Sequence, residues 1–382
     1  MDINKQNEIY NKLMNYCEAG NLNKLKKIII KHNINLHSND LPLLEIACEE
    51  GHFDIVKFLL CSTEIKNHSL INNKNNIYIN SPLIFACKNG HLDIVKFLLT
   101  SPELTTHSSI FEKTYIGEKT VLMVAAESGH LDILKFLLTN PQIKEKANIN
   151  DKNGVGKSAL IYACEAGQTE VVYYLLTSPE TKDLVSVKDA DMFGNNIFML
   201  TCYEGHINII KKLLSSDIKN QIDVNQVNAS GANSFMQTAF CKNNVKTFKH
   251  LFSKYSKEFD VNYKDNNGNT LPIYLCANGQ LDFLKYLFTH SKIKNKINIH
   301  QVNNKNENMF MMAVKKNQMD IVEFLLFDIN IQLDKHTISW LEKNIDEDEK
   351  YEKTLSLIKK RNLHEKLNDS LVDKKVNPKF KV

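Results

Sequence analysis

The sequence predicts an all-α solenoid of about nine helix-turn-helix repeats with β-hairpin or loop fingers, closed by a C-terminal helical cap. One pattern recurs four times in line, from Ser81, Thr120, Ser158 and Asn196. A glycine recurs between two apolar stretches at near-constant spacing, and the second stretch has helical periodicity. Fixed periods of roughly 20–50 residues are typical of stacked repeats, whose units bury their apolar faces only against neighbours.

Composition excludes several classes of protein. The 382 residues are 43% hydrophobic and 24% charged, and 48 basic residues against 44 acidic ones give a net charge of +4. That balance argues against a nucleic-acid-binding or membrane-coating protein. No apolar run approaches the roughly 18 residues of a membrane span, and the first residues lack the apolar core of a secretory signal. We therefore expect a cytoplasmic protein, or one secreted into a host cytosol.

The recurring glycine defines the repeats. It stands at Gly20, Gly51, Gly90, Gly129, Gly167, Gly205 and Gly279, with Asn243 and Asn317 in the same slot, and the spacings are 31, 39, 39, 38, 38, 38, 36 and 38 residues. Glycine adopts the left-handed conformation that ends a first helix. A second helix follows, with apolar residues such as Leu92, Val95 and Leu98 on one face. A proline after that helix, such as Pro102, stops it.

These motifs resemble the ankyrin repeat family over roughly residues 10–335. The family consensus TPLHxAAxxGHxxIVxxLL is similar to SPLIFACKNGHLDIVKFLL, which begins at Ser81, and to TLPIYLCANGQLDFLKYLF, which begins at Thr270. Family units have about 33 residues, so the surplus here falls after the second helix, as in residues 100–119. Long-spaced copies of this kind resemble ankyrin proteins of protists and intracellular bacteria. The resemblance implies a non-catalytic protein-binding module.

Three features resemble catalytic, metal-binding or phosphate-binding sites, but each is better explained by a structural role. Six cysteines share the column of the family's second alanine, which predicts core packing: Cys17, Cys48, Cys87, Cys164, Cys202 and Cys276. Histidines follow the glycine at His52, His91, His130 and His206, where the family hydrogen-bonds between loops. GVGKS, at residues 154–158, lacks the first glycine of a phosphate-binding loop. We therefore predict no catalytic residue, no metal and no cofactor.

The resemblance implies that a partner binds the hairpin tips and the exposed face of the first helices, on the concave side. The two residues after the small pair are, repeat by repeat, Glu18 and Ala19, Glu49 and Glu50, Lys88 and Asn89, Glu127 and Ser128, Glu165 and Ala166, Tyr203 and Glu204, Cys241 and Lys242, Ala277 and Asn278, and Lys315 and Lys316. Repeats one to six place six glutamates against one lysine there, whereas repeats seven to nine place three lysines and no acid.

This polarity predicts a partner with a basic segment, bound mainly by the acidic stripe, with Tyr203 as an aromatic anchor. The candidate partner-binding residues are Glu49, Glu50, Lys88, Glu127, Glu165, Tyr203 and Glu204. The alternative is that glutamate and lysine simply occupy solvated helix positions.

The predicted organisation is a repeat array over residues 1–335, a cap or degenerate tenth helix pair over 336–370, and a flexible basic tail over 371–382. The cap helix carries Leu355, Leu357, Ile358 and Leu363, and the single tryptophan, Trp340, precedes it. We expect a monomeric scaffold for a protein partner. A microbial effector that captures a host protein is the alternative. An enzyme would need its chemistry in residues 336–382, which are too few for a catalytic domain.

Overall fold

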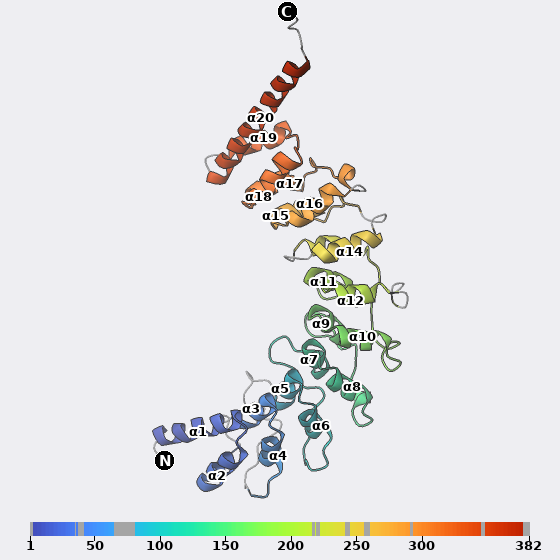
Figure 1. Cartoon of the computed structure of the whole chain (residues 1–382). Coiled ribbons are helices and arrows are strands. Elements are labelled where there is room, and N and C mark those ends of the chain that lie inside the picture. Colours follow the sequence, from blue (N-terminus) through green and yellow to red (C-terminus); the bar gives the residue numbers. More distant parts are fainter. Residues whose placement is uncertain are drawn as a thin grey trace, which may run out of the picture. The chain divides into compact units, whose positions relative to one another are not determined.

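The structure is a computed structural model that describes residues 3–34, 36, 42–64, 81–215, 218, 222–240, 245–255, 260–290, 293–344 and 348–376 (Figure 1). The chain divides into two compact units. Unit 1 contains Met1–Thr201 and Asn208–Ile222, and unit 2 contains Cys202–Ile207 and Asp223–Val382.

Helices alternate between a first and a second member of each repeat. In unit 1 they are α1 (Ile3–Glu18), α2 (Leu22–His32), α3 (Leu43–Glu50), α4 (Phe53–Cys61), α5 (Pro82–Asn89), α6 (Leu92–Thr100), α7 (Val121–Ser128), α8 (Leu131–Thr139), the 3-10 turn η1 (Lys144–Lys146), α9 (Ala159–Glu165) and α10 (Thr169–Thr177). Residues of α11 (Ile197–Glu204) and α12 (Ile207–Leu213) are divided between the units. Unit 2 continues with α13 (Ser234–Thr238), α14 (Val245–Tyr255), α15 (Leu271–Ala277), α16 (Leu281–Thr289), the 3-10 turn η3 (Lys294–Lys296), α17 (Met309–Lys315), α18 (Met319–Glu323), the π-helical η4 (Phe324–Asp328), α19 (Lys335–Lys343) and α20 (Glu349–Val376).

The helices of each unit stack in two rows. In unit 1 the first helices α3, α5, α7 and α9 pack in succession, and the second helices α4, α6, α8 and α10 form the other row (Figure 1). The fingers between repeats contain isolated bridges, such as Lys113 with Thr120, and the described residues contain no strand. The prediction of an all-α ankyrin-type solenoid is confirmed.

The first helices begin at side-chain caps. The side-chain oxygens of Ser81, Thr120 and Ser158 accept hydrogen bonds from the backbone N–H three residues on, as do those of Asn196 and Asn233. Such caps satisfy backbone donors that a helix start leaves unpaired. They therefore set where each first helix begins, independently of the glycine that follows it.

The cap of repeat seven corrects the predicted register. In repeat six Tyr203 follows the cap Asn196 by seven residues, and Phe240 follows the cap Asn233 by the same distance. The alignment on the glycine slot had given this position to Cys241, which lies outside the described residues. That prediction is wrong by one residue, because repeat seven holds an extra residue between its cap and its glycine slot.

The column of histidines connects neighbouring repeats. His91 Nε2 donates to the carbonyl oxygen of Glu49 at 2.9 Å, and His52 and His130 make the same bond to the preceding repeat. The acceptors are carbonyls near the C-terminal ends of first helices, which have no partner within the helix. Gln168 makes the equivalent bond to Glu127 in repeat five. The structural role that the resemblance implied for these three histidines is confirmed.

The same side chain makes the preceding glycine necessary. Gly90 has a φ of +85°, and a Cβ on it would lie 2.6 Å from Cε1 of His130. A Cβ on Gly129 would lie 2.4 Å from Oε1 of Gln168. Glycine is thus required both by its backbone conformation and by the side chain that crosses from the next repeat.

The column cysteines pack in the core. Cys17, Cys48, Cys87, Cys164, Cys202 and Cys276 are buried and free of disulfides, which confirms the core-packing prediction. Burial raises the pKa of the Cys17 thiol to about 12, and it raises the pKa of each of the other five thiols as well. Cys61 is partly exposed at the end of α4.

Helices α19 and α20 follow repeat nine. α20 packs on α17, α18 and α19, and Arg361 donates to the carbonyl of Ile331 at 2.7 Å. Among the side chains described in α20, which end at residue 363, the buried ones are Tyr351, Thr354, Ile358 and Arg361. Of the apolar residues expected to mark a cap, Leu363 is 61% exposed, because the buried face instead follows the spacing of those four residues. The packing supports the cap, which stays a prediction.

The predicted basic tail begins inside α20, since this helix continues to Val376. Residues 377–382 lie outside the described residues.

Replacing His91 tests the connection between repeats. His91→Ala removes the donor to Glu49 and leaves space above Gly51, so we expect a loss of about 1–2 kcal/mol in the free energy of unfolding. His91→Gln should lose less than about 0.5 kcal/mol, because glutamine fills this place in repeat five. Urea unfolding measures both. Equal losses in the two variants would show that the hydrogen bond is not what stabilises the stack.

Thiol labelling tests the burial of the cysteines. In the native protein we expect a neutral thiol reagent to label Cys61 well before any of the six column cysteines, because those thiols are buried and kept protonated. All eight cysteines should react in denaturant. Mass spectrometry of the labelled peptides gives the order of reaction, and rapid native labelling of Cys87 or Cys164 would contradict the packing described above.

Candidate partner-binding face

The predicted site residues lie where the first helices end. Each follows two buried residues near the end of its helix, such as Ala47 and Cys48 in α3, and its side chain points away from the core. Glu49, Glu50, Lys88, Tyr203 and Glu204 are exposed, whereas Glu127 and Glu165 are half-buried. In unit 1 the stacking of α3, α5, α7 and α9 brings Glu49, Glu50, Lys88, Glu127 and Glu165 onto one face. Tyr203 and Glu204 belong to unit 2.

Two glutamates of the predicted acidic stripe are already paired within the chain. Lys119 Nζ lies 2.7 and 2.5 Å from the two carboxylate oxygens of Glu127, and Lys157 Nζ lies 2.7 and 2.8 Å from those of Glu165. Each lysine stands on a finger, eight residues before its glutamate. At these two positions of the predicted acidic stripe, the glutamate charge is therefore neutralised within the chain.

Repeat nine contains the same ion pair with its charges exchanged. There the finger provides Glu307 and the helix provides Lys315, at 2.5 Å. The pKa of Glu307 lies below its usual value: burial acts to raise it, but Lys315 and the amide of Asn303 outweigh burial by stabilising the carboxylate. Opposite charges eight residues apart were visible in the sequence, and they were the signal that could have predicted these pairs.

The ring of Tyr162 lies close to the lysines of both ion pairs, in repeats four and five. Lys119 and Lys157 lie 4.7 and 5.7 Å from the ring centroid of Tyr162, so the ring interacts with both ammonium groups. The Tyr162 hydroxyl accepts from Asn153 Nδ2 at 2.8 Å. Burial, followed by the negative charge of Glu127, raises the pKa of Tyr162. These contacts bind the two fingers to the helices behind them.

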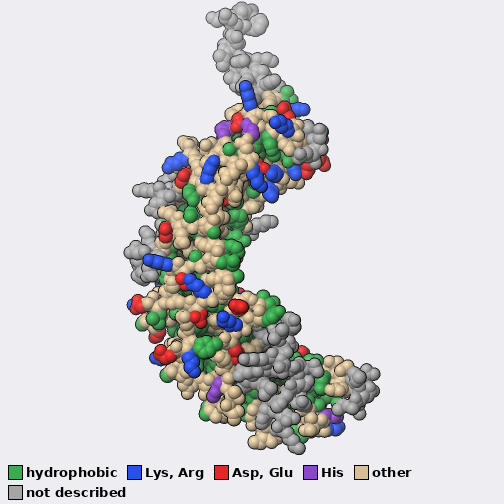
Figure 2. All heavy atoms as spheres, turned by 180° about the vertical axis from the view of Figure 1, so that it is seen from behind, with side chains coloured by type: hydrophobic (Ala, Val, Ile, Leu, Met, Phe, Trp, Pro, Cys, Tyr) green, Lys and Arg blue, Asp and Glu red, His purple; other side chains and the backbone are tan. Residues whose placement is uncertain are grey.

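Glu49 and Glu50 differ from the paired glutamates. Both side chains are exposed at the end of α3, and neither carboxylate forms an ion pair with any residue that the structure describes. Their charges are thus open to solvent. On the face drawn in Figure 2, by contrast, lysine and carboxylate side chains are largely interspersed.

Unit 2 brings Tyr203 together with two further rings. Its ring centroid lies 6.3 Å from that of Phe240, which lies 4.8 Å from that of Tyr274. Tyr203 and Phe240 are 42% and 40% exposed. The Tyr274 hydroxyl donates to the carboxylate of Asp265, and burial, together with that hydrogen bond, raises the pKa of Tyr274 to about 12. Sequence reasoning missed Phe240 because the glycine-based alignment gave its place to Cys241.

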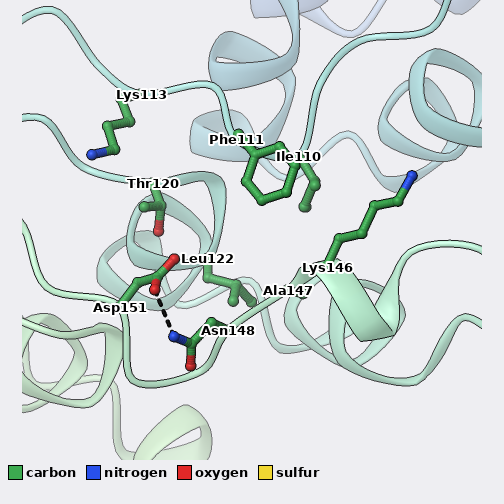
Figure 3. Close-up of a pocket in the computed structure, with 9 residues that line it drawn as sticks. All are labelled: Ile110, Phe111, Lys113, Thr120, Leu122, Lys146, Ala147, Asn148 and Asp151. Carbon is green, nitrogen blue, oxygen red and sulfur yellow. Dashed lines mark hydrogen bonds between the residues drawn. The ribbon is translucent and has the colours of Figure 1, made fainter.

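A small hollow lies beside the finger of repeat four. It measures about 60 Å³, and Ile110, Phe111 and Leu122 line its centre, while Lys113 and Lys146 extend away to opposite sides (Figure 3). Ligand pockets usually measure about 300–1,000 Å³. The hollow is too small to hold a cofactor. In the described part of the chain no three histidine, cysteine, aspartate or glutamate side chains are grouped as metal ligands require.

Comparison with known proteins identifies the family. Residues 65–153, 102–187, 140–228 and 235–335 match the family described as ankyrin repeats (3 copies). The chain belongs to the ankyrin repeat family, whose repeats are generally protein-binding modules. The family match contains only ankyrin repeats, which are typically non-catalytic. No described helix has the length and apolar character needed to cross a membrane.

One relative is similar to part of the chain. The chain is 30% identical over 128 residues to alpha-latroinsectotoxin-Lt1a of Latrodectus tredecimguttatus. The match covers 33% of the chain but 8% of the toxin, so the chain spans a small part of that protein's length.

Exchanging the charges of one pair tests the finger-to-helix contact. Lys119→Glu places two carboxylates together, and we expect it to lower the free energy of unfolding by about 0.5–1 kcal/mol. Adding Glu127→Lys recreates the arrangement of repeat nine and should restore most of the loss. Denaturation at low and high salt measures the coupling. A double variant no more stable than Lys119→Glu would show that the pair contributes nothing.

Proposed function

We propose that the chain is a non-catalytic scaffold that binds a partner protein along the first helices and fingers, with a basic segment of the partner at Glu49 and Glu50. The observation that carries this proposal is the contrast between two kinds of glutamate at the ends of the first helices. Glu127 and Glu165 are neutralised by lysines of their own fingers, whereas Glu49 and Glu50 are exposed and have no ion pair among the described residues.

Exposed carboxylates on a stacked helix face support the binding of a cationic partner for an electrostatic reason. A charge that already has a partner contributes little to the potential beyond it, while two adjacent unpaired charges attract a basic segment and orient it. Lys88 stands at the equivalent position of the next repeat. It would repel a long basic segment, so we propose that the cationic part of the partner is short.

The rings of Tyr203, Phe240 and Tyr274 offer a second kind of contact in unit 2. Exposed aromatic side chains that already contact one another need little further ordering when they bind, and tyrosine is enriched among residues that dominate binding energy. We propose that an apolar or aromatic side chain of the partner binds there, next to Glu204.

Selection from a library of short random peptides tests the proposal. Peptides retained by the full chain should be enriched in lysine and arginine. The double variant Glu49→Lys, Glu50→Lys should bind them about tenfold more weakly, which corresponds to about 1.4 kcal/mol. Fluorescence anisotropy at low and physiological salt measures the affinity, and the salt dependence should fall in the variant because the charge pairs are lost.

The paired glutamates provide the matched control. Glu127→Gln with Glu165→Gln also removes two carboxylates from the ends of first helices, and we expect the affinity to stay within about twofold of the parent. The proposal fails if the selected peptides are not basic, or if both double variants bind them as the parent does.

A further inference from the structure

Three successive fingers of unit 1 carry large apolar side chains at their tips. Ile116 precedes repeat four, Val155 precedes repeat five, and Met192 and Phe193 precede repeat six. Their exposed fractions are 81%, 37%, 60% and 59%, respectively. Single exposed apolar residues need no explanation, but a contiguous group of them is typical of an interaction surface.

Two hydrogen bonds to backbone carbonyls connect the three tips. The N–H of Met192 donates to the carbonyl of Val155 at 2.9 Å, and Asn153 Nδ2 donates to the carbonyl of Gly117 at 2.7 Å. Gly156 has a φ of +78°, and a Cβ on it would lie 3.1 Å from the nitrogen of Met192. The tips therefore form a continuous strip, here called the apolar tip strip and defined as Ile116, Val155, Met192 and Phe193.

The fold does not require these side chains. In unit 2 the N–H of Asn266 donates to the carbonyl of Ser230 at 3.0 Å, and the N–H of Asn304 donates to that of Asn267 at 2.9 Å. When positions are counted back from the cap of the helix that follows each finger, these hydrogen bonds join the same two positions as the bond between Met192 and Val155. Polar tips thus stack with the same geometry, so packing between fingers does not explain why the tips of unit 1 are apolar.

The tip backbone limits the kind of segment that can bind. The carbonyls of Gly117 and Val155 already accept hydrogen bonds from the next finger. An extended segment that binds as an added strand gains most of its affinity from such backbone groups, whereas a helix satisfies its own backbone and presents side chains. The strip is therefore suited to a helix.

The spacing of the fingers also fits a helix. Neighbouring packed helices lie about 8–10 Å apart, so successive fingers advance by a similar distance. An α-helix rises about 10.5 Å in seven residues. One apolar residue per heptad would meet one finger after another, and neighbours three or four residues away would widen the contact.

Charge indicates what surrounds the apolar seam of such a helix. The exposed charged side chains of these fingers are Lys113, Lys152, Lys188 and Glu118. Lys152 pairs with Asp189 at 2.9 Å, which leaves two lysines against one glutamate without an ion pair among the described residues. The carboxylate of the buried Asp191 accepts hydrogen bonds from the backbone N–H groups of Phe193 and Asn195. Lysine thus predominates at the solvent side of the strip, which favours acidic residues in the partner.

We infer that the apolar tip strip binds an amphipathic helix of a partner protein, with one apolar residue per heptad and acidic residues beside that seam. This inference rests on the proposed function as a protein-binding scaffold. It assigns the partner a second segment, distinct from the basic one at Glu49 and Glu50, and a different surface of the repeats to receive it.

The test uses a displayed library of helical peptides and two variants of the full chain. The tip variant combines Ile116→Asn, Val155→Asn, Met192→Asn and Phe193→Ser, which are side chains like those at the polar tips of unit 2. The control variant combines Ile30→Asn and Leu184→Asn, which are 46% and 64% exposed in the parent and lie off the strip. Both should unfold at the temperature of the parent, because the replaced side chains are exposed.

Helices selected on the parent should carry the heptad seam with flanking aspartate or glutamate. By fluorescence anisotropy they should bind the tip variant at least about tenfold more weakly and the control variant equally well. Selected helices without that seam, or equal binding to the tip variant, would overturn the inference. A third result would also overturn it: no helix is selected, and the parent sediments with vesicles of phosphatidylcholine and phosphatidylserine while the tip variant does not.

The outcome is separable from that of the proposed function. If Glu49→Lys with Glu50→Lys abolishes the binding of basic peptides while the tip variant leaves helix binding unchanged, the scaffold function stands and the helix site is rejected. If basic peptides bind neither parent nor variants and the strip still binds acidic helices, the site at Glu49 and Glu50 is rejected and the strip stands.

Discussion

The stack depends on one contact, in which a histidine or glutamine of one repeat crosses over the glycine of the repeat before it. The glycine must lack a Cβ because the crossing side chain occupies that space, as His130 does at Gly90. The donor satisfies a carbonyl that the end of the first helix leaves unpaired. The glycine thus ends the helix and turns the chain, and the histidine or glutamine after it connects the repeat to its neighbour. Because each residue is needed for the stack, the pattern recurs in successive repeats.

Because this contact lies near the helix ends, the surface positions around it are free to vary without altering the stack. The ion pair of repeat four and its charge-exchanged counterpart in repeat nine occupy equivalent positions with equivalent geometry. The finger tips likewise keep their backbone contacts whether the side chains are apolar, as at Met192, or polar, as at Asn266. The stacking of the repeats therefore does not determine which side chains stand at these positions.

The sequence predicted the fold because the glycine, the small pair and the apolar faces each have one physical solution, and these recur. It predicted the site less well. Pairs such as Lys157 with Glu165 join residues eight apart, and a single column of the alignment cannot reveal them. Phe240 was missed because repeat seven contains an extra residue between its cap and its glycine slot, and only the cap hydrogen bond of Asn233 fixes the count.

Intramolecular pairing also determines where binding energy can come from within unit 1. Where lysines of the fingers neutralise Glu127 and Glu165, the helix face offers a partner little net attraction. The exposed surface in front of those repeats is instead the apolar tip strip, whose burial would supply affinity without charge. Two repeats earlier, Glu49 and Glu50 have no ion pair among the described residues. A partner would therefore be oriented by charge at one part of the array and held by apolar contact at another.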